Sequence, residues 1–198
     1  MSLLPNPVRI MITTGLLLCN GLIHAQLYTI NSSKDMQMKL SGVSAQHKWE
    51  MNAKTLIGSA QFEFNRGGRH ELKSISSLIF SLEVENLKSG QRELDRNAYR
   101  ALKTYKYKDI FYQLVSATFT AEKDGYLVRT TGNLTIAGVT NEVNMDLFCV
   151  VNKDASITCK GSEQLKMRDY QVKLPAVMLG SMKTADTITL DYTLVYKK

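Results

Sequence analysis

The sequence predicts an all-β fold built from antiparallel strands. Apolar and polar residues alternate with a period of two, which is typical of strands with one buried and one solvated face. Turn-forming residues separate these stretches, and Asp124-Gly125 is a strong hairpin signal. The three prolines, at positions 5, 7 and 175, interrupt none of them. The pattern is compatible with a sandwich or a barrel. The clearest alternation is found in residues 43–52, 58–65, 78–85 and 188–196.

The N-terminal segment has the pattern of a cleavable signal peptide, which we expect to cover residues 1–25. Arg9 precedes an uncharged apolar run that ends at Ile23, and Ala25 supplies a small residue before the cut. The run is too short and too polar for a transmembrane helix, which needs about 20 apolar residues. Leu18 disfavours lipid attachment at Cys19. We therefore expect one domain, residues 26–198, that is periplasmic or secreted.

Two cysteines remain after this cleavage, Cys149 and Cys159. A turn at residues 152–155 would place them opposite each other on adjacent strands, within reach of a disulfide. An oxidising compartment favours that bond. The alternative is a pair of free, buried thiols that behave as small apolar side chains.

One stretch has the helical period of 3.6 instead of the period of two. In amphipathic helices of this kind, the basic side is usually a solvated surface. The alternative is a site for an anionic head group or a membrane-facing surface, to which the net charge of +7 would contribute. The apolar side of this predicted helix carries Leu94, Ala98, Ala101, Leu102 and Tyr105, and the basic side carries Arg92, Arg96, Arg100 and Lys103.

No recognisable catalytic or metal-binding motif occurs in the sequence. His47 and His70 belong to no ligand cluster, and there is no Cys-x-x-Cys, His-Glu-x-x-His, Gly-x-Ser-x-Gly or phosphate-binding glycine loop. A surface for single-stranded nucleic acid would interleave aromatic and basic residues, whereas the aromatic residues here alternate onto the predicted inner face. We therefore expect no enzymatic activity, no metal, no cofactor and no nucleic-acid partner.

Four stretches resemble the YceI-like family of exported, lipocalin-shaped barrels. The most specific is Gly132–Thr140, which reads Gly-Asn-Leu-Thr-Ile-Ala-Gly-Val-Thr. The His-x-Trp sequence at 47–49 is similar to the branch found in Bacteroidetes-type bacteria. One departure is Lys108, where the family often has proline. The other three stretches are residues 41–49, 80–103 and 166–175 with the closing strand.

The resemblance implies an antiparallel lipocalin-like β-barrel of about eight strands with a short amphipathic helix, a size at which a closed sheet can hold one small ligand. It also implies a tunnel for a polyisoprenoid or a related isoprenoid or fatty-acid-like lipid. The alternatives are a solid-core structural or interaction protein of the cell envelope and, third, a lipid-modifying enzyme. Dimerisation through an exposed strand edge is a further alternative that the sequence leaves open.

We assign candidate ligand-binding residues on this basis. Arg96, Arg100 and Lys103 are candidates for binding an anionic head group. Tyr99, Leu102 and Tyr105 are candidates for capping the tunnel. The predicted wall consists of Trp49, Phe62, Phe64, Leu78, Phe80, Leu82, Leu134 and Ile136.

Overall fold

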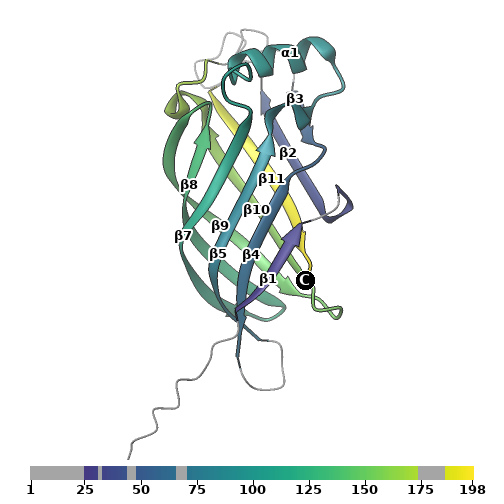
Figure 1. The fold of residues 1–198 in the computed structure, drawn as a ribbon, viewed down its shortest axis with the longest axis vertical. Coiled ribbons are helices and arrows are strands. Elements are labelled where there is room, and N and C mark those ends of the chain that lie inside the picture. Colours follow the sequence, from purple (N-terminus) through teal and green to yellow (C-terminus); the bar gives the residue numbers. More distant parts are fainter. Residues whose placement is uncertain (1–24, 31–32, 44–47, 66–70, 174–185) are drawn as a thin grey trace, which may run out of the picture.

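The computed structural model describes residues 25–30, 33–43, 48–65, 71–173 and 186–198. The expected signal peptide lies outside this part, apart from Ala25. One antiparallel sheet curls into a barrel, and an α-helix lies across one end of it (Figure 1). The helices are η1 (Ser33–Asp35), η2 (Val84–Asn86), α1 (Arg92–Ala101) and η3 (Met167–Tyr170). The strands are β1 (Ala25–Ile30), β2 (Met36–Val43), β3 (Lys48–Ala53), β4 (Ile57–Phe64), β5 (Leu72–Glu83), β6 (Leu87–Lys88), β7 (Asp109–Glu122), β8 (Gly125–Ile136), β9 (Val139–Val151), β10 (Ile157–Lys166) and β11 (Thr187–Tyr196).

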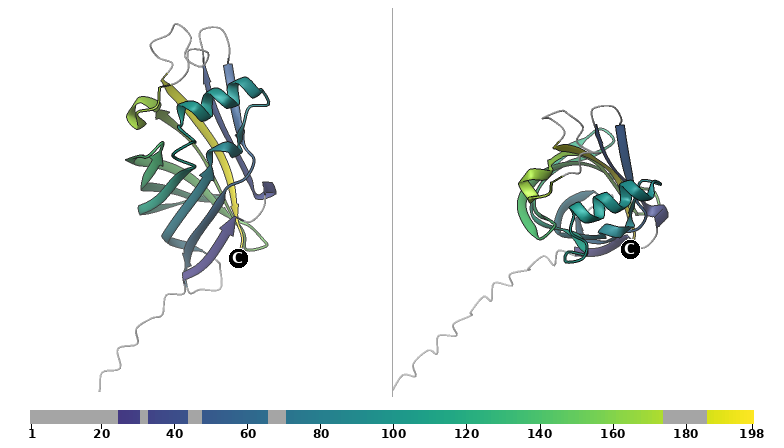
Figure 2. Two further views of the ribbon diagram at one scale, coloured as in Figure 1. Left: turned by 45° about the horizontal axis from the view of Figure 1, so that its top comes forward. Right: turned by 90° about the horizontal axis from the view of Figure 1, so that it is seen from above.

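The sheet closes on itself at both ends of the barrel, through different strands. Its eleven described strands follow the order β1-β4-β5-β7-β8-β9-β10-β11-β2-β3-β6. At the base, Thr29 of β1 exchanges two backbone hydrogen bonds with Lys197, of 2.7 and 2.9 Å. At the helix end, β6 continues β5 and pairs with β3. The view from above shows the resulting ring, with α1 across its opening (Figure 2).

The predicted fold class is confirmed: the protein is an all-β antiparallel barrel with one short helix. The ring closed at Thr29–Lys197 contains eight strands, β1, β4, β5 and β7 to β11. The described sheet has three more strands than this ring because β2, β3 and the two-residue β6 extend it on the far side of β11. Strand β11 shows the predicted alternation, since every second residue from Ile188 to Tyr196 is buried.

Hairpin turns form where the sequence predicts them. Ala137 and Gly138 connect β8 to β9 with φ angles of 50° and 80°. Positive φ at both turn positions is the geometry that matches the twist of a two-residue hairpin. Between β9 and β10, the carboxylate of Asp154 accepts hydrogen bonds from the backbone and hydroxyl of Ser156. These two bonds lower the pKa of Asp154.

Three aromatic rings lie flat on the inner wall, each over a glycine. A Cβ atom at Gly42 would approach the Trp49 ring to 2.3 Å, and one at Gly132 would approach the Tyr112 ring to 2.3 Å. A Cβ atom at Gly161 would lie 2.2 Å from the Tyr192 hydroxyl. Side-chain carbons do not pack this closely, so these ring positions require glycine beneath them.

Strands β9 and β10 separate halfway along their length. Their pairing runs from Ile157–Val151 to Gly161–Leu147 and ends there. Beyond that point β9 stays paired with β8, and β10 stays paired with β11. Glu163 spans the separation, because its Oε1 accepts a 2.9 Å hydrogen bond from the backbone N–H of Asp146.

The β8–β9 turn generates a stability prediction. Gly138 has φ +80°, and a Cβ atom there would meet the Tyr107 ring at 2.3 Å, whereas Gly90 has φ +84° and nothing within 4 Å. Left-handed backbone costs about 1–2 kcal/mol for a non-glycine residue. We expect Gly90→Ala to lower the free energy of unfolding by about 1 kcal/mol, and Gly138→Ala to lower it further because Tyr107 must also move. Urea denaturation measures both, and equal losses would contradict the role of Tyr107.

A two-part apolar cavity inside the barrel

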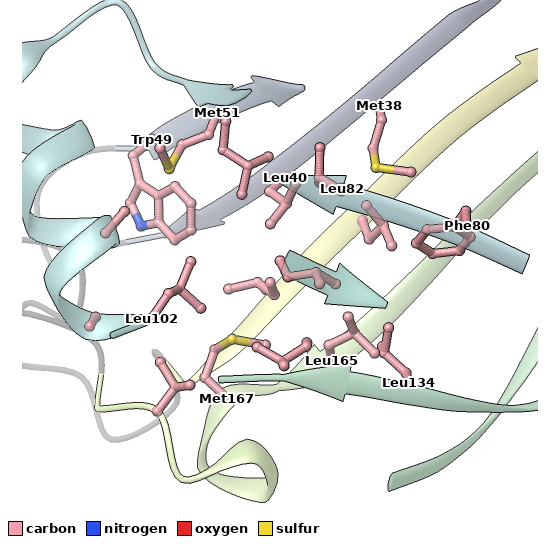
Figure 3. A pocket seen from close by; sticks show the side chains of 18 residues that line it. Met38, Leu40, Trp49, Met51, Phe80, Leu82, Leu102, Leu134, Leu165 and Met167 are labelled. Carbon is pink, nitrogen blue, oxygen red and sulfur yellow. The ribbon is translucent and has the colours of Figure 1, made fainter. Parts of the chain in front are cut away.

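The larger cavity lies in the barrel beneath α1, which we call the upper cavity. Its volume is about 70 Å³, and every residue that lines it is apolar (Figure 3). The wall comes from strands on all sides of the barrel, because each contributes its inward-facing alternate residues. The lining residues are Met38, Leu40, Trp49, Met51, Phe80, Leu82, Leu87, Ala98, Ala101, Leu102, Ile110, Leu134, Ile136, Leu165, Met167, Val172, Ile188 and Leu190.

Helix α1 covers the upper cavity as a lid. Leu94 and Ala98 are buried against the barrel, and Ala98, Ala101 and Leu102 line the cavity. Tyr99 fastens the helix to β6, since its hydroxyl donates a 2.6 Å hydrogen bond to the carbonyl of Leu87. The apolar side of the lid therefore forms the cavity roof, as the helical pattern in the sequence indicates.

The basic side of α1 points to solvent. Arg96 and Arg100 are exposed, and Lys103 is half-buried just after the helix with φ 56°. Among the residues that the structure describes, no charged one lines the upper cavity. Arg96 and Arg100 consequently lie on the outer surface of the lid, and Lys103 follows its C-terminal end.

A second, lower cavity continues towards the base of the barrel. Its volume is about 30 Å³. Met38, Phe80 and Leu190 line both cavities, so these side chains stand between the two spaces. Unlike the upper cavity, the lower one contains hydroxyl and thiol groups in its wall. Its remaining lining residues are Leu78, Tyr112, Thr130, Met145, Leu147, Cys159, Tyr192, Leu194 and Tyr196.

Packed aromatic rings form the floor below the lower cavity. The ring of Phe62 meets Tyr28 edge-on at a centroid distance of 5.3 Å, and meets Tyr196 at 5.6 Å. Phe64 contacts Tyr28 from the other side at 6.3 Å. Edge-to-face contacts of this kind stabilise an apolar cluster beyond its buried area.

The structure brings seven of the eleven predicted tunnel residues to the cavities. Leu78 lines the lower cavity, and Phe80 lines both. The other four lie elsewhere: Phe62 and Phe64 belong to the floor, Tyr99 fastens the lid, and Tyr105 is 80% exposed. The remaining five, all in the upper cavity, are Trp49, Leu82, Leu102, Leu134 and Ile136.

Sequence reasoning missed much of the wall. The period-two pattern in β2 places Met38 and Leu40 on the inner face and would have identified them. The apolar face of β11 is recognisable in the sequence, but its assignment to the tunnel depends on knowing that β11 and β5 border the same cavity. Met167 and Val172 carry no periodic signal, because they lie in and after the short helix η3.

The cysteine pair lies beside the lower cavity. Cys149 and Cys159 face each other directly in the β9–β10 register, and both are buried. Their sulfur atoms are 2.8 Å apart, with no bond drawn between them in this structure. The hydrogen bond to Cys149, and then burial, raise the pKa of Cys159 well above its ordinary value.

Among the described residues, no three His, Cys, Asp or Glu side chains are arranged to hold a metal ion. Within the same residues, no helix has the length and apolar character that crossing a membrane requires.

Comparison with known proteins identifies relatives of this barrel. The crystal structure of BcnA from Burkholderia cenocepacia matches with a TM-score of 0.64 and 18% identity, over 84% of this chain and 98% of that one. A polyisoprenoid binding domain from Saccharophagus degradans, implicated in plant cell wall breakdown, matches with a TM-score of 0.65 and 12% identity, over 86% and 97%. No curated protein matches the chain.

A third solved structure, the YceI protein of Campylobacter jejuni, matches with a TM-score of 0.53 and 20% identity, over 71% of this chain and 81% of that one. At these identities the structural matches establish a shared fold. The family model described as YceI-like domain matches residues 28–196, which is nearly all of the described barrel. The chain therefore belongs to the YceI-like family.

Proposed function

We propose that this protein is a non-enzymatic carrier of a long apolar molecule, such as a polyisoprenoid or a related lipid, which it holds inside the barrel in the periplasm or outside the cell. The observation that supports this most directly is the pair of neighbouring cavities, of about 70 and 30 Å³, in a barrel interior that the fold could have filled. The polyisoprenoid-binding description of the Saccharophagus degradans domain points to the same ligand class.

Burial of the ligand chain would supply the affinity. Apolar surface removed from water contributes about 25 cal/mol per Å², and the upper cavity offers only apolar contacts. The cavities are narrow, but Met38, Met51 and Met167 line the upper one. Methionine side chains are unbranched and adapt their shape, so these three are the part of the wall that would make room for a chain.

The exposed cations of the lid would act before the ligand is inside. Arg96, Arg100 and Lys103 lie on or beside the outer surface of α1, where they would attract an anionic head group or an anionic membrane surface over a long range. The export signal expected at residues 1–25 supports a location in which a lipid must cross an aqueous space.

The single tryptophan provides a direct binding assay. Trp49 is the only tryptophan in the sequence and lines the upper cavity. We expect geranylgeraniol to shift its fluorescence emission saturably, and native mass spectrometry to show a one-to-one complex. A protein that stays empty with this probe and is also empty when purified from a bacterial envelope would contradict the carrier function and favour the solid-core alternative.

Filling the space beneath the lid should block binding. Ala98 is buried and lines the upper cavity, whereas Ala121 is exposed on β7. We expect Ala98→Phe to weaken geranylgeraniol binding by about tenfold or more, because tenfold corresponds to only about 1.4 kcal/mol. Ala121→Phe, which adds the same ring on the outside, should leave the dissociation constant unchanged. Equal affinities in the two variants would place the ligand outside the upper cavity.

The proposed location also predicts the state of the cysteines. In an oxidising compartment we expect Cys149 and Cys159 to form a disulfide, which closes a short loop and stabilises by about 2–3 kcal/mol at most. Protein secreted by its native route should therefore lose stability in urea when reduced. The Cys149→Ala, Cys159→Ala double variant is the control and should not respond to reductant. A wild-type protein that is equally insensitive would contradict the bond.

A further inference from the structure

Two buried hydroxyl groups in the wall of the lower cavity lack a hydrogen-bond partner. They belong to Tyr192, which is 8% exposed, and Tyr196, which is 1% exposed. Within the described chain, neither hydroxyl oxygen makes a hydrogen bond. Buried polar groups nearly always have a partner in folded proteins, and leaving one unpaired is destabilising. Two such groups in one cavity therefore point to a missing polar partner.

The rings are held so that their hydroxyls cannot turn to solvent. Tyr192 extends from β11 across Gly161, where its hydroxyl lies over β10. The ring of Tyr196 is fixed by the edge-on contact with Phe62 in the floor, at 5.6 Å and 72°. Both residues line the lower cavity, which is the space beside these two rings.

The other hydroxyls of this cavity are already paired. Tyr112 extends from β7 over Gly132 and donates to Thr130 at 3.3 Å, and Thr130 donates to the carbonyl of Met145 at 3.0 Å. These two hydrogen bonds pair the hydroxyls of Tyr112 and Thr130. In the lower cavity, both unpaired hydroxyls therefore belong to β11.

The surroundings favour a neutral partner over an anion. No lysine or arginine of the described chain lines the lower cavity, and the half-buried carboxylate of Glu163 lies close enough to Tyr192 to raise its pKa further, after burial. Burial also raises the pKa of Tyr196, so both hydroxyls stay protonated and can donate. A phosphate or carboxylate would lack a counter-charge here, which strongly disfavours its burial.

We propose that the lower cavity is a subsite for a neutral oxygen function at the inner end of the bound lipid, an alcohol or a carbonyl, which accepts hydrogen bonds from Tyr192 and Tyr196. The volume of about 30 Å³ suits a group of that size, since a water molecule needs roughly 10–15 Å³ by the same measure. This inference rests on the proposed carrier function and adds the chemistry and the orientation of the ligand.

The test compares two probes that differ only in the oxygen, geranylgeraniol and the corresponding hydrocarbon without the hydroxyl. Binding is followed by Trp49 fluorescence and native mass spectrometry. We expect the wild type to prefer the alcohol by about five- to tenfold, as one or two buried hydrogen bonds allow. The double variant Tyr192→Phe, Tyr196→Phe keeps both rings and should lose this preference.

Tyr170 provides the matched control. Its hydroxyl is also buried and unpaired within the described chain, but it lies in η3 and does not line the lower cavity. Burial raises its pKa to about 12. Tyr170→Phe should keep the full preference for the alcohol. If Tyr170→Phe and the double variant lose the preference equally, the subsite is not at the base.

The direction in which the bound chain lies in the barrel gives a second, independent test of the subsite. Two monobrominated hexadecanols, with bromine on the terminal carbon or beside the hydroxyl, place a quencher at opposite ends of one chain. With the hydroxyl at the base, the terminal bromine should quench Trp49 more strongly. The reverse pattern would overturn the subsite while leaving the carrier function intact.

The remaining outcomes separate the two proposals. If both probes bind but the double variant keeps the wild-type preference, or if there is no preference, ordered water satisfies the hydroxyls and the subsite is wrong. If neither probe binds, the carrier function and the subsite fall together. A lower melting temperature of the ligand-free double variant would likewise indicate water, because removing unpaired hydroxyls should not destabilise the protein.

Discussion

Three large rings lie flat against the inner wall of this barrel because each lies over a glycine, and the hollow interior depends on this contact. A ring of eight strands is barely wide enough for its own side chains, so an aromatic residue that pointed to the axis would fill it. Trp49 over Gly42 borders the upper cavity, while Tyr112 over Gly132 and Tyr192 over Gly161 border the lower one. Each cavity is thus bordered by at least one ring that packs over a glycine.

The two cavities differ in chemistry although they share Met38, Phe80 and Leu190. Above these residues, every described residue of the wall is apolar, which suits a hydrocarbon chain whatever its pattern of methyl branches. Below them, the wall also carries hydroxyl and thiol groups. Most of the strands that border one cavity border the other as well, so this difference arises from depth along the same strands.

Much of the fold was predictable from the sequence, and much of the site was not. The alternation in residues 188–196 and the turn at Asp124-Gly125 are local signals, and the structure follows both. The local pattern also separates inward from outward residues, but it cannot say how deep along the barrel an inward residue lies. For that reason Phe62 and Phe64 were predicted in the tunnel wall, although depth assigns them to the floor.

The same limitation applies to the lid and to the tyrosines of β11. The helical pattern predicts that Leu94 and Ala98 face the barrel, as they do, but the pattern continued to Tyr105, which follows the helix end and is exposed. Tyr192 and Tyr196 were recognisable as inward-facing residues. Their unpaired hydroxyls were not, because a missing hydrogen bond is a property of the packed interior and leaves no periodic signal.

The closing contact between Thr29 and Lys197 joins segments from nearly opposite ends of the described chain. Contacts of such wide sequence separation form slowly, because loop-closure entropy opposes them until the rest of the sheet is in place. The hairpins from β7 to β10 are local and can assemble first. The inner face of the sheet is consequently open to its surroundings before β11 joins β1. A lipid captured by the nascent, unsealed sheet needs no passage under α1, and loading during folding is a physically different route from exchange through the finished lid.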